Sequence, residues 1–132
     1  QLPEGAPPAR MIRAVPVRSG SDFLADQDLS RRRCRALLLD TYKPGYYGGT
    51  GETFDWREVA RYEQYSLPII LAGGLRADNV QTALDLAAPS GVDVGSGVES
   101  APGRKDPVKV NRFIQAVRSW EKKRRGNADA TG

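Results

Sequence analysis

The chain has 132 residues, 39% of them hydrophobic, so we expect one domain or part of one. Its formal net charge of +4 at pH 7 comes from scattered Arg and Lys, so we expect no nucleic-acid partner. It contains no histidine, which excludes imidazole catalysis and histidine-ligated metals, and its single cysteine excludes an internal disulfide and fits a reducing compartment. Because no stretch approaches ~18 apolar residues and the first ten residues lack a signal-peptide core, we expect a soluble, cytoplasmic chain without a membrane partner.

Strand-like and helix-like segments alternate along the chain, which is typical of βα units around a parallel sheet. Residues 1–10 are expected to be the end of a preceding helix or loop. Residues 11–17 alternate apolar and polar side chains as a strand does. A Ser-Gly-Ser turn at 19–21 follows and predicts a short helix from about Asp22.

A second strand is predicted at 36–40, where an apolar run ends in Asp40 and enters a glycine-rich loop at 41–53. Parallel α/β folds keep their chemistry at the carboxyl ends of their strands. Asp40 could therefore be a general acid or base held under a mobile loop, or it could cap the following turn. The residues of this segment alone leave both interpretations open.

The next elements carry clear local signals. Asp55 as N-cap with Glu58 three residues later predicts a capping box, and Phe54 and Val59 occupy the positions of a hydrophobic staple. A third strand is predicted at 69–72. The helix after it has one buried face in the i, i+3, i+4, i+7 pattern, made by Val80, Ala83, Leu84 and Ala87.

The last βα unit begins with a strand at 92–94. Asp106 is the predicted N-cap of the final helix, with Pro107 at its first position. The apolar stripe of this helix consists of Val110, Phe113, Ile114 and Val117, and the basic residues 122–125 suit the negative end of its dipole. Residues 126–132 are expected to be a disordered tail, so the folded unit is predicted to span 11–125.

Two successive strands end in glycine loops, which is what a phosphate site requires. Glycine lets backbone N–H groups approach phosphate oxygens without a Cβ in the way. The alternative is that the glycines only form tight βα turns, but two such loops in consecutive units favour phosphate. We therefore expect a bulky residue at position 97 to weaken phosphate binding before it affects stability. The predicted phosphate-binding residues are Gly73, Gly74, Gly95, Ser96 and Gly97.

Eight segments, in order and in spacing, resemble the phosphoribosylanthranilate isomerase family of tryptophan biosynthesis. They are LLLDT (37–41), GGTG (48–51), FDW (54–56), PIILAGGL (68–75), DNV (78–80), GVDV (91–94), SGVES (96–100) and PGRKD (102–106). The resemblance implies an α/β fold, the C-terminal half of a (β/α)8 TIM barrel with about four parallel strands, numbers five to eight, and their helices.

The activity implied by this resemblance is the Amadori rearrangement of N-(5-phosphoribosyl)anthranilate to a carboxyphenylamino-deoxyribulose phosphate. The enzyme would be an isomerase of the aldose–ketose, intramolecular oxidoreductase type. Neither a metal nor an organic cofactor is implied, and the partner is a small phosphoribosyl substrate. Two positions between the motifs depart from the family pattern, because Gly95 stands where many members have serine and Arg76-Ala77 replaces the usual helix entry.

The resemblance also implies roles for individual residues. Asp40 resembles the general acid, and the loop of Gly48, Gly49, Thr50 and Gly51 resembles the one that closes over the substrate, unless it is an ordinary surface turn. Asp93 is singled out by its own position, because an inward-pointing polar residue inside the last strand needs a partner: it would contact substrate hydroxyls, or it would be hydrogen-bonded to backbone in the barrel floor. The family's base is a cysteine in a KICGIT-type motif on the first strand, which this sequence lacks. Cys34 precedes the strand that ends at Asp40, so we expect it at the opposite end of the sheet in a structural role.

Two alternative functions are another sugar-phosphate TIM-barrel enzyme and an inactive half-barrel fragment. The combination of GGTG and FDW after the strand-end Asp40 favours the isomerase over the first alternative. Four parallel strands cut from a closed barrel have two unpaired edges. We therefore expect self-association or pairing with an N-terminal half, and no isomerase activity from this chain alone.

Overall fold

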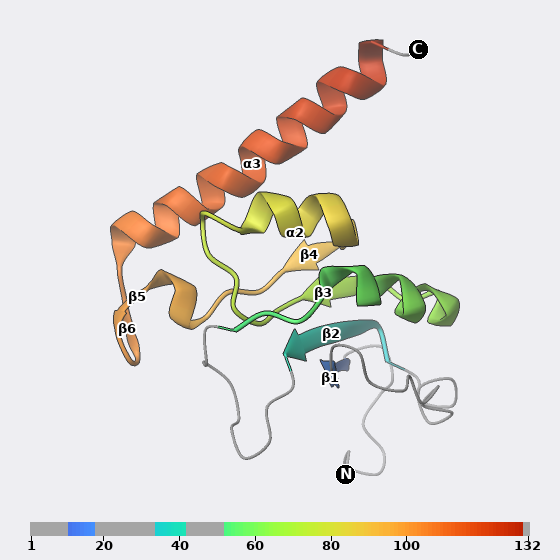
Figure 1. Ribbon diagram of the computed structural model, residues 1–132, viewed down its shortest axis with the longest axis horizontal. Helices are drawn as coiled ribbons and strands as arrows, with labels where there is room; N and C mark the ends of the chain where they lie inside the picture. Colours follow the sequence, from blue (N-terminus) through green and yellow to red (C-terminus); the bar gives the residue numbers. More distant parts are fainter. Residues whose placement is uncertain (1–10, 18–33, 42–51, 131–132) are drawn as a thin grey trace.

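The computed structural model describes residues 11–17, 34–41 and 52–130, and these form a main parallel sheet with a layer of helices and a small separate hairpin (Figure 1). Four strands pair in the order β1-β2-β3-β4, and every neighbouring pair is parallel. They are β1 (Ile12–Val17), β2 (Ala36–Thr41), β3 (Ile69–Leu71) and β4 (Gly91–Val92). The predicted α/β class with four parallel strands is therefore confirmed.

The register of the sheet separates two faces. Leu37 and Leu39 of β2 and Leu71 of β3 have no exposed surface and lie on the face that the helices cover. Leu38, between them, pairs with Ile70, and both are only half-buried. Since successive strand side chains point to opposite faces, the sheet has one buried face and one open face.

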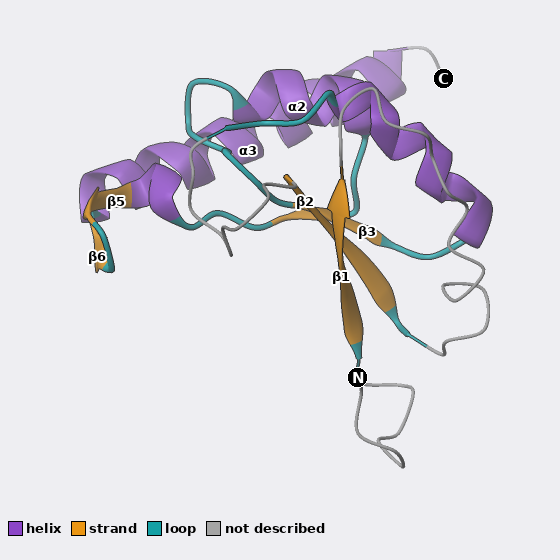
Figure 2. Ribbon diagram, turned by 60° about the horizontal axis from the view of Figure 1, so that its bottom comes forward, coloured by secondary structure: helices purple, strands orange, loops and turns teal. Residues whose placement is uncertain are grey.

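The helices of the described residues cover one face of the sheet, as Figure 2 shows for α2 (Val80–Ala87) and α3 (Pro107–Ala130). The 3₁₀ helix η2 (Trp56–Tyr65) packs beside α2, and α2 packs against α3. The predicted stripe of α2 is confirmed, because Val80, Ala83, Leu84 and Ala87 are all buried. Together with the buried face of the sheet, they form the core.

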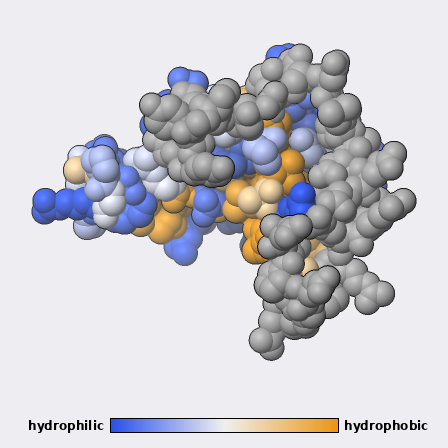
Figure 3. Space-filling view, turned by 90° about the horizontal axis from the view of Figure 1, so that it is seen from below, coloured by the Kyte–Doolittle hydropathy of each residue, from blue (hydrophilic) through white to orange (hydrophobic). Residues whose placement is uncertain are grey.

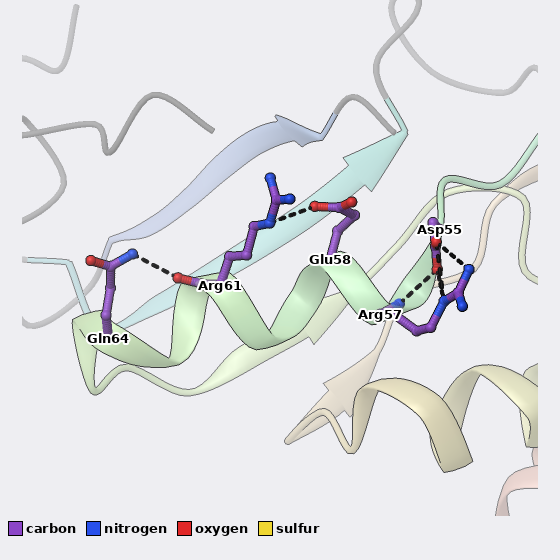
Figure 4. A network of polar contacts seen from close by, with 5 residues as sticks. All are labelled: Asp55, Arg57, Glu58, Arg61 and Gln64. Atoms are coloured by element: carbon purple, nitrogen blue, oxygen red, sulfur yellow. Dashed lines mark hydrogen bonds and ion pairs between the residues drawn. The ribbon is translucent and has the colours of Figure 1, made fainter. Parts of the chain in front are cut away.

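The segment after Asp55 is a 3₁₀ helix, and its first turn is capped as expected (Figure 4). The Asp55 carboxylate accepts a hydrogen bond from the backbone N–H of Arg57 at 3.0 Å and pairs with the Arg57 guanidinium. Glu58, predicted to complete a capping box, forms an ion pair with Arg61 one turn later, at 2.9 Å. Phe54 and Val59, the predicted staple pair, are both buried in the core.

The last helix begins where it was predicted to begin but ends later. Asp106 accepts hydrogen bonds from the backbone N–H groups of Val108 and Lys109, so it caps α3. The prediction of a disordered tail from Gly126 was wrong as far as Ala130, because α3 continues to that residue. One helical glycine costs only ~1 kcal/mol, and the residues from Asn127 to Ala130 include no proline, so the helix can propagate through Gly126.

The open face and the two outer strands leave apolar surface uncovered in the described part of the chain. Ile12 of β1 is 55% exposed, and apolar residues are visible in the middle of the molecule when it is viewed from below (Figure 3). Beside β4, which is shorter than the predicted 92–94, lies a cavity of about 400 Å³. Its walls include Val92 and Val94 on one side and Ile114 and Val117 of α3 on the other.

The segment between β4 and α3 contains three short elements. A short 3₁₀ helix, η3 (Ser96–Val98), leads into an antiparallel hairpin of β5 (Glu99–Ala101) and β6 (Arg104–Lys105). Among the described helices, none is both long enough and apolar enough to cross a membrane. The predicted short helix from Asp22 and the expected end of an element at 1–10 lie outside the described residues.

Candidate functional site

Asp40 lies near the carboxyl end of β2, half-buried on the open face of the sheet. Its Oδ1 accepts a hydrogen bond from the backbone N–H of Thr41 at 2.7 Å. This contact is local, to the last residue of β2, so it leaves open both interpretations of Asp40 that the sequence offered. Oδ2 has no hydrogen-bond partner among the described residues.

The next residue closes the loop that follows β2. The Thr41 hydroxyl donates a hydrogen bond to the backbone carbonyl of Glu52 at 3.0 Å. This bond joins the two sides of the segment 42–51. The predicted substrate-loop residues, Gly48, Gly49, Thr50 and Gly51, fall within that segment and lie outside the described residues.

The first glycine loop lies directly against Asp40. A Cβ on Gly73 would be 2.6 Å from Asp40 Oδ1 and would also collide with the Thr41 side chain. A Cβ on Gly74 would overlap the backbone carbonyl of Glu52. Both glycines have positive φ, 91° and 64°, which other residues rarely adopt. The glycines are therefore required by close packing and by backbone conformation.

The second glycine loop lies against the first. A Cβ on Gly97 would overlap the backbone carbonyl of Leu75, which directly follows Gly74. Asp40, the loop at 73–75 and the loop at 95–97 are thus contiguous at the carboxyl edge of the sheet. The expectation that a bulky residue at 97 affects binding before stability is revised, because even a methyl group there meets main chain.

Backbone donors in these loops are available to a ligand. The N–H groups of Gly73, Gly74 and Gly95 have no acceptor among the described residues. Gly95 also has open space where a Cβ would lie. Peptide N–H groups without a protein acceptor must bind water or a ligand, and several together suit an anion.

The first loop is fixed by Asn79, which directly precedes α2. Asn79 Nδ2 donates to the carbonyl of Gly74 at 2.9 Å, and Asn79 Oδ1 accepts from the backbone N–H of Arg76 at 2.8 Å. Asn79 therefore supports the glycine loop before α2, while the first turn of α2 has no side-chain cap, as the Arg76-Ala77 departure led us to expect. By contrast, the neighbouring Arg76–Asp78 ion pair is exposed and adds little.

Comparison with known proteins bears on what this arrangement does. Residues 7–116 match the family model described as N-(5'-phosphoribosyl)anthranilate (PRA) isomerase. The N-(5'-phosphoribosyl)anthranilate isomerase of Magnetococcus marinus is 52% identical over 110 residues, which are 83% of this chain and 50% of that protein. The enzyme of Syntrophus aciditrophicus is 46% identical over 87% of this chain and 48% of that protein.

The chain belongs to the PRA isomerase family. It spans about half the length of the curated relatives it matches. The crystal structure of phosphoribosyl anthranilate isomerase from Thermotoga maritima superposes with a TM-score of 0.67 at 40% identity, over 82% of this chain and 51% of that one. A crystal structure of phosphoribosyl anthranilate isomerase in complex with reduced 1-(o-carboxyphenylamino)-1-deoxyribulose 5-phosphate superposes with a TM-score of 0.62 at 33% identity. The superposition covers 82% of this chain and 48% of that one.

Two further residues singled out in the sequence lie apart from the contiguous loops. Asp93 directly follows β4, and its backbone N–H extends the sheet by donating to Leu71. The register puts it on the same face as Asp40, with the two backbones about 10 Å apart across two strand spacings. Its side chain is exposed.

Cys34 precedes β2, so roughly 20 Å along the chain separates it from Asp40.

Sequence reasoning missed the residues that support the site. Thr41 and Glu52 close the loop after β2, Asn79 fixes the first glycine loop, and Lys105 with Glu99 contacts the second. Asn79 and Lys105 stand in the family-like motifs DNV and PGRKD, and that was a signal that these positions matter. Their roles depend on contacts between segments, which spacing alone does not give.

Proposed function

We propose that this chain supplies the general acid and the phosphate site of phosphoribosylanthranilate isomerase, an aldose–ketose isomerase of tryptophan biosynthesis. The observation that carries the proposal is the contiguity of Asp40 with the two glycine loops, in a chain of this family. A carboxyl group beside several unpaired N–H groups can hold a sugar phosphate and deliver a proton to the same molecule.

The proposed substrate is N-(5-phosphoribosyl)anthranilate, bound through its phosphate. Gly73, Gly74, Gly95, Ser96 and Gly97 would form the phosphate site, and the ligand of the related complex, a ribulose 5-phosphate derivative, has the same group. Anchoring the phosphate would bring the ribose to Asp40. Asp93, exposed on the same face, would contact substrate hydroxyls, and the loop at 48–51 would close over the substrate.

The reaction requires an acid and a base. Asp40 would protonate the ring oxygen of the ribose, so the ring opens, and a base would then take a proton from the adjacent carbon. Cys34 is at the far end of β2 and cannot serve. The base would come from the part of the family that these residues do not match, where the family resemblance implies a cysteine in a KICGIT-type motif.

The partner would therefore be an N-terminal half carrying the first four strands. It would pair with β1 and β4 and cover the apolar cavity between β4 and α3. In its absence, two copies of this chain would associate through the same edges. Another sugar-phosphate barrel enzyme could use similar glycine loops, but the family match over residues 7–116 favours the isomerase.

The test is Asp40→Asn in a barrel completed with an N-terminal half from a relative. The amide keeps the shape of the carboxyl group but cannot deliver the proton, so we expect kcat to fall by ~10²-fold or more with little change in KM. Asp78→Asn, which removes an exposed carboxylate near the same loops, is the matched control and should leave kcat unchanged. An Asp40→Asn barrel that turns over at the parent rate would refute the role of Asp40.

A further inference from the structure

The segment that carries the second glycine loop is held from one side by Lys105. Lys105 Nζ donates a hydrogen bond to the backbone carbonyl of Gly95 at 3.1 Å and pairs with Glu99 Oε1 at 2.7 Å. Glu99 and Lys105 are register partners across the β5–β6 hairpin. One ammonium group therefore ties the hairpin to the start of the glycine loop.

The bond to Gly95 fixes the direction of a peptide group. A trans peptide is planar, and its C=O and N–H point in opposite directions. With the Gly95 carbonyl turned toward Lys105, the N–H of Ser96 is turned away from the hairpin. The same carbonyl also accepts from the N–H of Val98 at 3.3 Å, so both bonds favour one orientation of this peptide.

We infer that Lys105 is a positioning residue for substrate phosphate: it orients the Gly95–Ser96 peptide so that the Ser96 N–H faces the bound phosphate. This inference rests on the proposed function, because it presupposes a phosphate at the glycine loops. Lys105 acts through Gly95 and is itself about half exposed.

Further hydrogen bonds hold Glu99, the partner of Lys105, in place. Glu99 Oε2 accepts from the N–H of Gly103 at 3.3 Å, and the carbonyl of Glu99 accepts from Lys109 Nζ at 2.8 Å. The hydrogen bond from Lys105 is the largest cause that lowers the pKa of Glu99, and the backbone hydrogen bond from Gly103 adds to it. Glu99 is therefore ionised at neutral pH, and Lys105 keeps its partner.

The experiment measures binding of inorganic phosphate to the full chain through the backbone amide shifts of Ser96 and Gly97, together with thermal unfolding. We expect Lys105→Met to weaken phosphate binding about tenfold, the cost of losing a charge-assisted hydrogen bond. Lys105→Arg keeps a cationic donor and should restore most of the affinity. Lys122→Met removes the same charge from an exposed position of α3 and is the matched control.

A charge swap separates positioning from hairpin stability. Glu99→Lys combined with Lys105→Glu restores an ion pair across the hairpin but puts an acceptor beside the Gly95 carbonyl. We expect this double variant to recover the melting temperature lost in Lys105→Met without recovering phosphate affinity. Recovery of both quantities would overturn the inference and give Lys105 a purely structural role.

The outcomes also separate this inference from the proposed function. If phosphate shifts Ser96 and Gly97 equally in the unchanged chain and in Lys105→Met, the inference is wrong and the phosphate site stands. If phosphate shifts neither amide in the unchanged chain, the proposed phosphate site is wrong, and Lys105 then has no phosphate to position.

Discussion

Gly73 shows how closely the parts of the site are packed. The absence of a side chain there leaves room for Asp40 Oδ1 and for the Thr41 side chain. The same residue has φ +91° and an N–H group without an acceptor in the described part of the chain. Gly73 can therefore form a tight turn and also bind phosphate, because the turn that requires glycine leaves the Gly73 N–H without an acceptor in the described part of the chain.

Replacing Gly73 tests this packing. Gly73→Ala would strain the backbone by at least ~1 kcal/mol and push Asp40 and Thr41 aside, so we expect lower stability in urea denaturation. Gly91→Ala in β4 is the matched control, because its φ is not positive and the added methyl group would make only an ordinary contact, 3.9 Å from Ile70 Cγ1. It should not lower the free energy of unfolding, since alanine loses less conformational freedom on folding than glycine. Equal stability of the two variants would contradict the packing described for Gly73.

The sequence could predict the positions of the site residues better than their contacts. The glycines, Asp40 and Asp93 all lie at or just beyond the carboxyl ends of the predicted strands, so their common edge of the sheet was predictable. Whether a glycine makes room for a ligand or for a neighbouring carbonyl is decided by segments far apart in the chain. For this reason the expected consequence of changing Gly97 needed revision once its proximity to Leu75 was known.

Among the elements, η2 depends on its N-terminal cap. The side-chain hydrogen bond from Arg57 is the main cause that holds the pKa of Asp55 below the ordinary value for an aspartate, 3.8. A carboxyl group with a lowered folded-state pKa stabilises the fold above its unfolded pKa, and this contribution is lost as pH falls through the folded value. The effect of the cap should therefore be full at neutral pH and should decline below about pH 3.8.

Asp55→Ala tests the cap. At pH 7 it should lower the melting temperature by a few degrees, because it removes the acceptor for the Arg57 N–H and the partner of its guanidinium. Asp55→Asn retains an acceptor and should lose less. The gap in melting temperature between Asp55→Ala and the parent should narrow at pH 3. A gap that is the same at pH 7 and pH 3 would show that ionised Asp55 does not stabilise η2.

The presence and the starts of the helices could be predicted from local signals. The 3₁₀ geometry of η2 and the β5–β6 hairpin could not. The four buried residues of α2 follow one helical face, and Asp106 with Pro107 marks the start of α3. The 3₁₀ geometry of η2 and the β5–β6 hairpin have no such period, since both are set by packing and by cross-strand contacts such as Glu99–Lys105. The end of α3 was missed because a single glycine was taken as a stop signal.

The molecule as a whole has an incomplete sheet in its described part. Parallel sheets are normally covered on both faces, whereas here the described helices cover one face, and the cavity beside β4 is lined by seven apolar residues together with Arg118 and Glu121. Ile114 lines this cavity and is 41% exposed, while Leu86 on α2 is 51% exposed and lies outside it. The two residues offer matched probes of a docking surface.

Ile114→Glu should weaken association with an N-terminal half at least tenfold, because it places a charge where apolar surface would be buried. Leu86→Glu should leave association unchanged. Sedimentation of each variant with the N-terminal half measures both effects, and circular dichroism checks that the fold is retained. Equal association of the two variants would exclude the cavity as the pairing surface.

The central claim, that this chain holds the acid and the phosphate site but not the base, is tested most directly by turnover of N-(5-phosphoribosyl)anthranilate. The purified chain should show no activity alone and should gain activity when it is mixed with an N-terminal half that carries the KICGIT-type cysteine. Replacing that cysteine, or changing Asp40 to Asn, should abolish the gain. Turnover by this chain alone, at a rate that depends on Asp40, would contradict the claim and show that its own residues supply the base.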